Sequence, residues 1–152
     1  MRKSTIIKDL QGMLARALPE VKYIDKDWGQ LYYEQPPVGW PCILIDIEQV
    51  DPRQLNDGNE KDTAIVVLTV ANRRTNASSA HAPRAAKEAS CQTLDLTDDI
   101  HDLVQGFSFG EYSPLDAQQF YKLNDLPGGT EGYAMRYRTA YNVAPSLMAI
   151  QD

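Results

Sequence analysis

The amino-acid sequence predicts an α+β fold, with a mainly antiparallel mixed sheet packed against two helices. Apolar and polar residues alternate with a period of two in some segments, which is typical of strands. In two other segments, apolar residues recur every three or four positions, which is typical of helices. The expected elements follow in the order helix, strands, helix, strands. With 152 residues, the chain is expected to form one domain over residues 1–152.

The N-terminal part is expected to hold a helix at residues 4–18 and short strands at 21–25 and 30–34. Apolar residues of the helix would form its buried stripe: Ile6, Ile7, Leu10, Met13, Leu14 and Ala17. Pro19 is expected to end the helix. The stretch EQPPVGWP (34–41) is expected to be a bent surface crossing, because its prolines lack the N–H that a central strand needs.

Two longer strands are expected at 41–49 and 63–71, joined as an antiparallel pair by a long polar loop at 51–62. In the first, alternation places Ile43, Ile45 and Ile47 on one face and Leu44, Asp46 and Glu48 on the other. The second (TAIVVLTVA) is almost wholly apolar, which favours a central strand covered on both faces. We therefore expect Ile65 and Val67 in the core.

The C-terminal half is expected to begin with a loop at 72–83 and a long helix at 84–104. The buried stripe of this helix would consist of Ala85, Ala89, Leu96, Ile100, Leu103 and Val104. Strands are expected around Phe107 and Phe109, at 117–123 and at 132–143. In the last strand, alternate residues are expected to pack inward: Tyr133, Met135, Tyr137, Thr139, Tyr141 and Val143. Arg136 and Arg138 would lie on the opposite, polar face.

Composition excludes some classes of function. The net charge is −6 with a pI near 4.9, which argues against general nucleic-acid binding. Apolar runs such as IVVL (65–68) are far too short to cross a bilayer, and the N-terminus does not resemble a signal peptide. Cys42 and Cys91 are expected to be reduced thiols in the core.

Three side-chain groupings suggest chemistry, and each has a stronger structural explanation. Asp98 and His101 have the spacing of two metal ligands on a helix, but an acidic solvated helix face explains them better. Asp46 and Glu48 resemble an acid–base pair, yet such pairs are common on solvated strands. Cys91 lacks the surroundings of a nucleophile. We therefore expect no enzyme activity, no catalytic residues, no cofactor and no metal.

The candidate interface residues are aromatic or basic. The region around Trp28 and Trp40 is rich in aromatic residues and proline, and fits a hydrophobic flap over the core and a protein interface equally well. The basic pairs Arg73/Arg74 and Arg136/Arg138 would contact an acidic partner surface or nucleic-acid phosphates, although solvated strand ends and cross-strand salt bridges explain them better than nucleic-acid binding does. The candidates are Trp28, Trp40, Arg73, Arg74, Arg136 and Arg138.

The chain resembles the small tail-completion and tail-terminator proteins of long-tailed bacteriophages and prophages. The resemblance rests on the N-terminal helix, the segment VKYIDKDWGQLYYEQPPVGWPCILIDIE (21–48) and the apolar strand at 63–71. It continues through the long helix at 84–104 and the closing strand YRTAYNV (137–143). It covers most of the chain in the order of its elements.

This resemblance implies a non-enzymatic α+β subunit that forms a ring, expected to be a hexamer, at the end of the tail tube. The implied partners are other copies of the chain, the tail tube and head–tail connector proteins. DNA would pass through the ring only transiently, and no membrane would be involved. The expected location is the virion, and the host cytoplasm during assembly. Other head–tail joining proteins share this architecture. A monomeric peptide- or protein-binding module and, less favoured, a metal-dependent hydrolase are the alternatives from other classes.

The ring hypothesis assigns a role to one basic pair. Arg73 and Arg74 lie in a loop that would reach the acidic face of helix 95–102 on the next subunit. The long polar loops, the Trp/Pro region and the strand edges would supply the rest of the contact.

Overall fold

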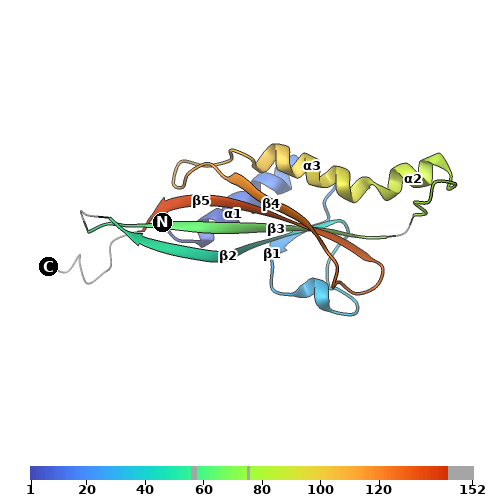
Figure 1. Cartoon of the computed structure of the whole chain (residues 1–152), viewed down its shortest axis with the longest axis horizontal. Helices are drawn as coiled ribbons and strands as arrows, with labels where there is room; N and C mark the ends of the chain where they lie inside the picture. Colours follow the sequence, from blue (N-terminus) through green and yellow to red (C-terminus); the bar gives the residue numbers. More distant parts are fainter. Residues whose placement is uncertain (56–57, 75, 144–152) are drawn as a thin grey trace.

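A five-stranded mixed sheet runs through the computed structural model, which describes residues 1–55, 58–74 and 76–143 (Figure 1). The strands are β1 (Tyr23–Lys26), β2 (Cys42–Gln54), β3 (Glu60–Arg73), β4 (Asp116–Leu123) and β5 (Thr130–Asn142). Their spatial order is β1-β2-β3-β5-β4. β1 is parallel to β2, and the other neighbouring pairs are antiparallel. The predicted α+β class with a mainly antiparallel mixed sheet is confirmed.

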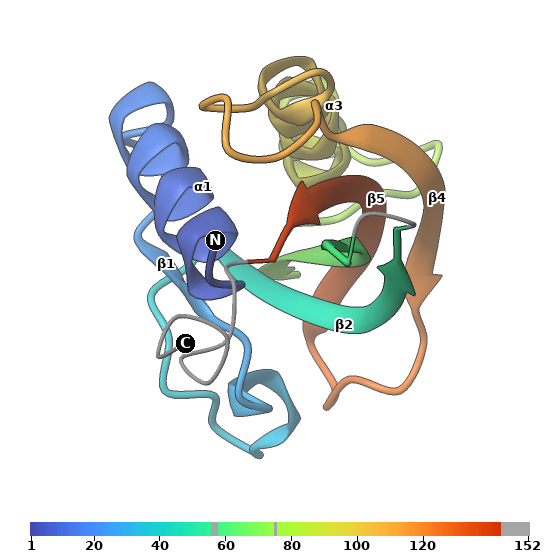
Figure 2. The ribbon, with the colours of Figure 1, turned by 90° about the vertical axis from the view of Figure 1, so that its left-hand side faces the viewer.

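Helices α1 (Ser4–Ala17) and α3 (Gln92–Val104) lie on one face of the sheet (Figure 2). Their apolar stripes and the facing strand residues form the main core: Ile6, Leu10, Leu14, Ile43, Ile45, Val66, Leu68, Leu96, Ile100 and Tyr137. A smaller cluster of Leu31, Cys42, Leu44 and Ala71 lies on the opposite side, beneath the 3-10 helix η1 (Gln30–Tyr32). We call that opposite side, which displays Asp46, Val67 and Arg136, the open face.

The predicted alternation of β5 is confirmed. Five of the residues expected to pack inward are buried: Tyr133, Met135, Tyr137, Thr139 and Tyr141. Arg138 is exposed and Arg136 is half-buried. The strand's inward side chains therefore supply one wall of the core, while its arginines belong to the open face.

Strand β3 corrects the predicted core assignment of Ile65 and Val67. These two side chains are half-buried, whereas Val66 and Leu68 are fully buried between the sheet and the helices. The segment is apolar on both faces, but helices cover only one of them. Ile100 is fully buried, as predicted.

The predicted helix at 84–104 is two helices, α2 (Arg84–Ser90) and α3, separated at Cys91. The Ser90 hydroxyl donates to the Lys87 carbonyl at 2.6 Å, an interaction that competes with the helical backbone pattern. Ala85 is exposed, because α2 extends beyond the core (Figure 1). Cys91 is exposed too, so the prediction of a core thiol is wrong at Cys91 and confirmed at Cys42.

One predicted loop and two predicted strands also differ. The segment 51–62 is mostly a hairpin, because β2 and β3 pair as far as Gln54 and Glu60. The segment 30–34 holds η1 instead of a strand. The segment around Phe107 and Phe109 is irregular rather than a strand. Among the described residues, no helix has the length and apolar character needed to span a membrane.

Candidate functional site

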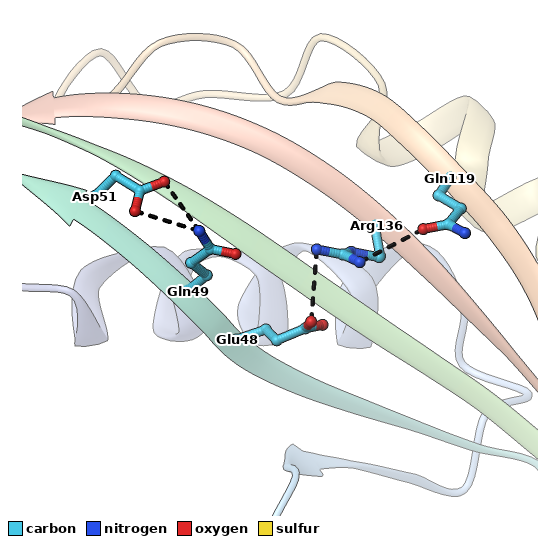
Figure 3. Close-up of polar contacts among 5 residues, drawn as sticks. All are labelled: Glu48, Gln49, Asp51, Gln119 and Arg136. Atoms are coloured by element: carbon cyan, nitrogen blue, oxygen red, sulfur yellow. Dashed lines mark hydrogen bonds and ion pairs between the residues drawn. The ribbon is translucent and has the colours of Figure 1, made fainter.

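A row of polar side chains crosses the open face (Figure 3). Arg136 on β5 ion-pairs with Glu48 on β2 across 3.5 Å, and its other terminal nitrogen donates to Gln119 on β4 at 3.4 Å. The pairing register of β2 shifts between Ile47 and Gln49. Glu48 and Gln49 therefore both reach the open face, as Figure 3 shows. Arg136 on β5 is thus held within the subunit by side chains of two other strands, β2 and β4.

Asp46 and Glu48 line a hollow of about 180 Å³ on the open face, together with Asp27 and Tyr32. Burial raises the pKa of the Asp46 carboxyl, and the Ile47 backbone N–H donates to that carboxylate at 2.9 Å. Each member of the predicted carboxylate pair thus has a partner within the sheet. The hollow suits a cationic side chain better than a bulky substrate.

Trp28 and Trp40 have different environments, so the structure does not bring them together as one flap. The Trp28 side chain is half exposed, makes an edge-to-face contact with Tyr33 and donates its indole N–H to Asp25 at 3.2 Å. Trp40 packs against the smaller cluster beneath η1, and the Arg73 guanidinium lies 5.5 Å from its ring centroid. Trp28 belongs to an exposed aromatic patch with Tyr32 and Tyr33, whereas Trp40 is mainly structural.

The two basic pairs differ in how much they are engaged. Arg73 stacks on Trp40, and Arg74 donates from Nη2 to the Ser78 hydroxyl at 2.9 Å. The Arg74 backbone N–H also donates to the Gly129 carbonyl at 2.8 Å, which fastens this loop to the β4–β5 turn. Arg138 is exposed, and among the described residues its side chain has no ion pair, hydrogen bond or ring contact, unlike those of Arg73, Arg74 and Arg136. It is the arginine best placed to meet another molecule.

His101, one of the two suspected metal ligands, is engaged by a tyrosine. Its Nδ1 lies 2.8 Å from the Tyr137 hydroxyl, and the two rings stack with centroids 5.9 Å apart. Asp98 lies beside them in a hollow of about 400 Å³ between α3 and β4, lined also by Phe120 and Met135. Across the described parts of the chain, no group of three His, Cys, Asp or Glu residues is placed to hold a metal ion.

Sequence reasoning missed the separation of charge between the two core helices. The outer side of α3 carries a continuous acidic stripe, and the outer side of α1 is basic. The acidic face of α3 was expected, because Asp95, Asp98, Asp99 and Asp102 have the spacing of a single helix face. The signal for the basic side of α1 was the presence of Lys8 and Arg16 beside a single acidic residue, Asp9. The contact between His101 and Tyr137 had no comparable signal, because the two residues are 36 positions apart.

Neither a protein-family model nor a curated protein sequence matches this chain. Its fold is similar to that of a chain in a solved structure described as "Virion of native gene transfer agent (GTA) particle". The similarity has a TM-score of 0.54 and covers 90% of this chain and 92% of the other, at 12% sequence identity. At that identity, the similarity shows a shared fold.

Proposed function

We propose that this chain is a structural protein of a phage-like virion, and more specifically a tail-terminator or tail-completion subunit. Such subunits would form a ring, expected to be a hexamer, that ends the tail tube and docks to the head. The supporting observation is the fold shared with a chain of a gene transfer agent virion over nearly the whole length of both chains. The order of helices and strands agrees with the resemblance stated above.

The distribution of surface groups supports an assembling subunit. The exposed aromatic patch of Trp28, Tyr32 and Tyr33 is the kind of surface that protein interfaces use. Strand β4 lies at the edge of the sheet, and its Phe120 side chain is 51% exposed. An exposed strand edge is normally covered or paired. A ring of copies on the tail tube, facing the head connector, would cover these surfaces.

The six interface candidates divide in this proposal into residues that contact neighbouring molecules and residues that support the contact surface. Trp28 and Arg138 are offered as contacts with neighbouring molecules. Arg73 and Arg74 shape a loop that lies near such a contact, while Trp40 and Arg136 hold the surface in place. DNA would pass through the ring only transiently, and assembly would take place in the host cytoplasm without a membrane.

Deleting the gene for this chain tests the proposal. Particles made without it should have heads that lack attached tails, or tails of irregular length, when viewed by electron microscopy. Mass spectrometry should find the chain in purified complete virions at a low, fixed copy number relative to the tail-tube protein. Tails of normal length joined to heads in its absence would overturn the proposal.

One observation favours a second candidate, a monomeric peptide-binding module. The hollow between α3 and the edge strand β4 is lined by Phe120 and Met135, so an extended peptide pairing with β4 would have a place for one apolar side chain. Light scattering at rising concentrations, with and without tail tubes, discriminates the two: a peptide-binding module stays monomeric in both.

A further inference from the structure

The outer face of α3 carries a row of four carboxylates. Asp95, Asp98, Asp99 and Asp102 are all exposed, and their spacing places them along one side of the helix. α3 has no lysine or arginine. Within the described residues, none of these carboxylates has a hydrogen bond or ion pair. Like charges at this spacing repel one another, so the stripe is a surface that a cationic partner would stabilise.

The outer face of α1 has the opposite charge. Lys8 and Arg16 are exposed there, and Arg2 and Lys3 are exposed immediately before the helix begins. The acidic residue of this helix, Asp9, is half-buried and accepts a hydrogen bond from the Tyr112 hydroxyl at 2.9 Å. The Arg16 guanidinium folds back over Gly12, where an added Cβ would lie 3.4 Å from Arg16 Nη1. This orientation concentrates positive charge between Lys8 and Arg16.

The hollow beside the acidic stripe has the lining that a long cationic side chain needs. It measures about 400 Å³ and combines the Asp98 carboxylate with the apolar surfaces of Phe120 and Met135. The methylene groups of lysine or arginine pack on apolar and aromatic surface while the charged head reaches an acid. The hollow therefore adds shape and apolar contact to the charge of α3.

We infer that the acidic stripe of α3 and the hollow beside it receive the basic face of α1 from the next copy of this chain. Within one subunit, α1 and α3 lie on the same face of the sheet (Figure 2). The apolar stripes of both helices belong to the core, and their charged residues Lys8, Arg16, Asp98 and Asp102 are exposed. The two faces are complementary in charge and lie on different helices, so their contact is head-to-tail and can close into a ring. Lys8 or Arg16 is the side chain that enters the hollow.

This inference rests on the proposed ring, and it specifies the two surfaces that meet between neighbouring subunits. It replaces the expected pairing of Arg73 and Arg74 with the acidic helix. Those two guanidinium groups are already engaged by Trp40 and Ser78 within their own subunit. The cations of α1 have no such partner among the described residues.

A charge-swap experiment tests the inference. One variant reverses the acidic stripe (Asp98→Lys/Asp102→Lys) and a second reverses the basic face (Lys8→Glu/Arg16→Glu). Asp95 stays unchanged because it lies in the first turn of α3, where a carboxylate stabilises the helix. The control is Arg53→Glu/Lys61→Glu, which reverses two exposed cations paired across the β2–β3 hairpin. Oligomeric mass is measured by sedimentation at rising concentration, after circular dichroism shows that each variant is folded.

Each reversed variant alone should assemble at least tenfold more weakly than the natural chain, while the control assembles normally. An equal mixture of the two reversed variants should recover assembly, because each acidic α1 then meets a basic α3. The chain that carries all four substitutions should recover it as well. Recovery in the mixture is specific to a contact between these two helices.

Two outcomes would overturn the inference and separate it from the proposed function. If the natural chain assembles but the reversed variants assemble equally well, or the mixture fails to recover, the ring stands and this contact is wrong. If the natural chain stays monomeric at the highest concentration and on tail tubes, both the ring and the contact are wrong.

Discussion

His101 on α3 and Tyr137 on β5 are joined by a 2.8 Å contact between Nδ1 and the phenolic oxygen, with their rings stacked at an interplanar angle of 24°. Tyr137 is almost completely buried. The contact therefore ties the acidic helix to the centre of the sheet through a polar group that would otherwise be buried without a partner.

Removing that hydroxyl should destabilise the fold modestly. Tyr137→Phe removes the hydrogen bond and keeps the ring, so we expect a loss of about 1 kcal/mol in the free energy of unfolding. Urea denaturation measures this loss. Tyr33→Phe, at an exposed ring with a similar size change, serves as the control and should change stability by no more than a few tenths of a kcal/mol. Equal effects of the two substitutions would contradict the assigned role.

Stability should fall at alkaline pH. Burial raises the pKa of Tyr137 to about 12, and burial together with the nearby Asp62 carboxylate raises that of Tyr141 to about 12. Tyrosine in an unfolded chain titrates near pH 10. The folded state thus favours the neutral phenols, and this stabilisation is complete below about pH 10 and is lost as the pH rises toward 12. Urea denaturation at several pH values measures the decline.

The same experiment on a variant provides the control for this pH effect. Tyr137→Phe/Tyr141→Phe lacks both phenols, so its stability should decline less steeply over that pH range. An unchanged slope would show that other groups cause the alkaline loss.

Two adjacent valines test the assignment of faces in β3. Val66 is fully buried under the helices, and Val67 is half-buried on the open face. Val66→Ala should cost about 2 kcal/mol or more through lost burial and a cavity, and Val67→Ala about half of that or less. Ile100→Ala, in the same core, should cost about 2–5 kcal/mol. Thermal and urea unfolding compare the three variants, and a larger loss at Val67 would reverse the assigned faces.

The ion pair between Glu48 and Arg136 should contribute little to stability. The two side chains are 46% and 26% exposed, so water and salt screen their attraction. A double-mutant cycle with Glu48→Gln and Arg136→Met should give a coupling energy below about 1 kcal/mol, smaller still at high salt. A coupling above about 2 kcal/mol would show that the polar row is a main stabilising element of the sheet.

The fold could be predicted where one face of an element is polar. In β5, Arg136 and Arg138 separate the inward aromatic residues, so the alternation has one interpretation. In β3, both faces are apolar, and the pattern could not show that helices cover the side of Val66 instead of that of Val67. The polar ends of β2 and β3 were mistaken for a loop, because backbone ladder bonds form without apolar side chains.

The site was less accessible to sequence reasoning. No glycine or proline marks the separation of α2 from α3 at Cys91, and the contact of His101 with Tyr137 depends on how α3 lies across the sheet. The sequence singled out the arginines as candidates but could not show what they contact. The partners of Arg73, Arg74 and Arg136 are distant in sequence or depend on the direction of the side chain. The acidic face of the helix at 95–102 was predicted from its spacing, whereas the basic character of α1 was not.

The opposite charges of α1 and α3 give the subunit an electric dipole across its helical side. Such a field acts beyond contact distance, over about 8 Å at physiological ionic strength. In the proposed ring contact, an approaching copy would therefore be turned before the surfaces touch, and productive encounters would become more frequent. Ionic strength would then affect the association rate of the subunits as well as their affinity for one another.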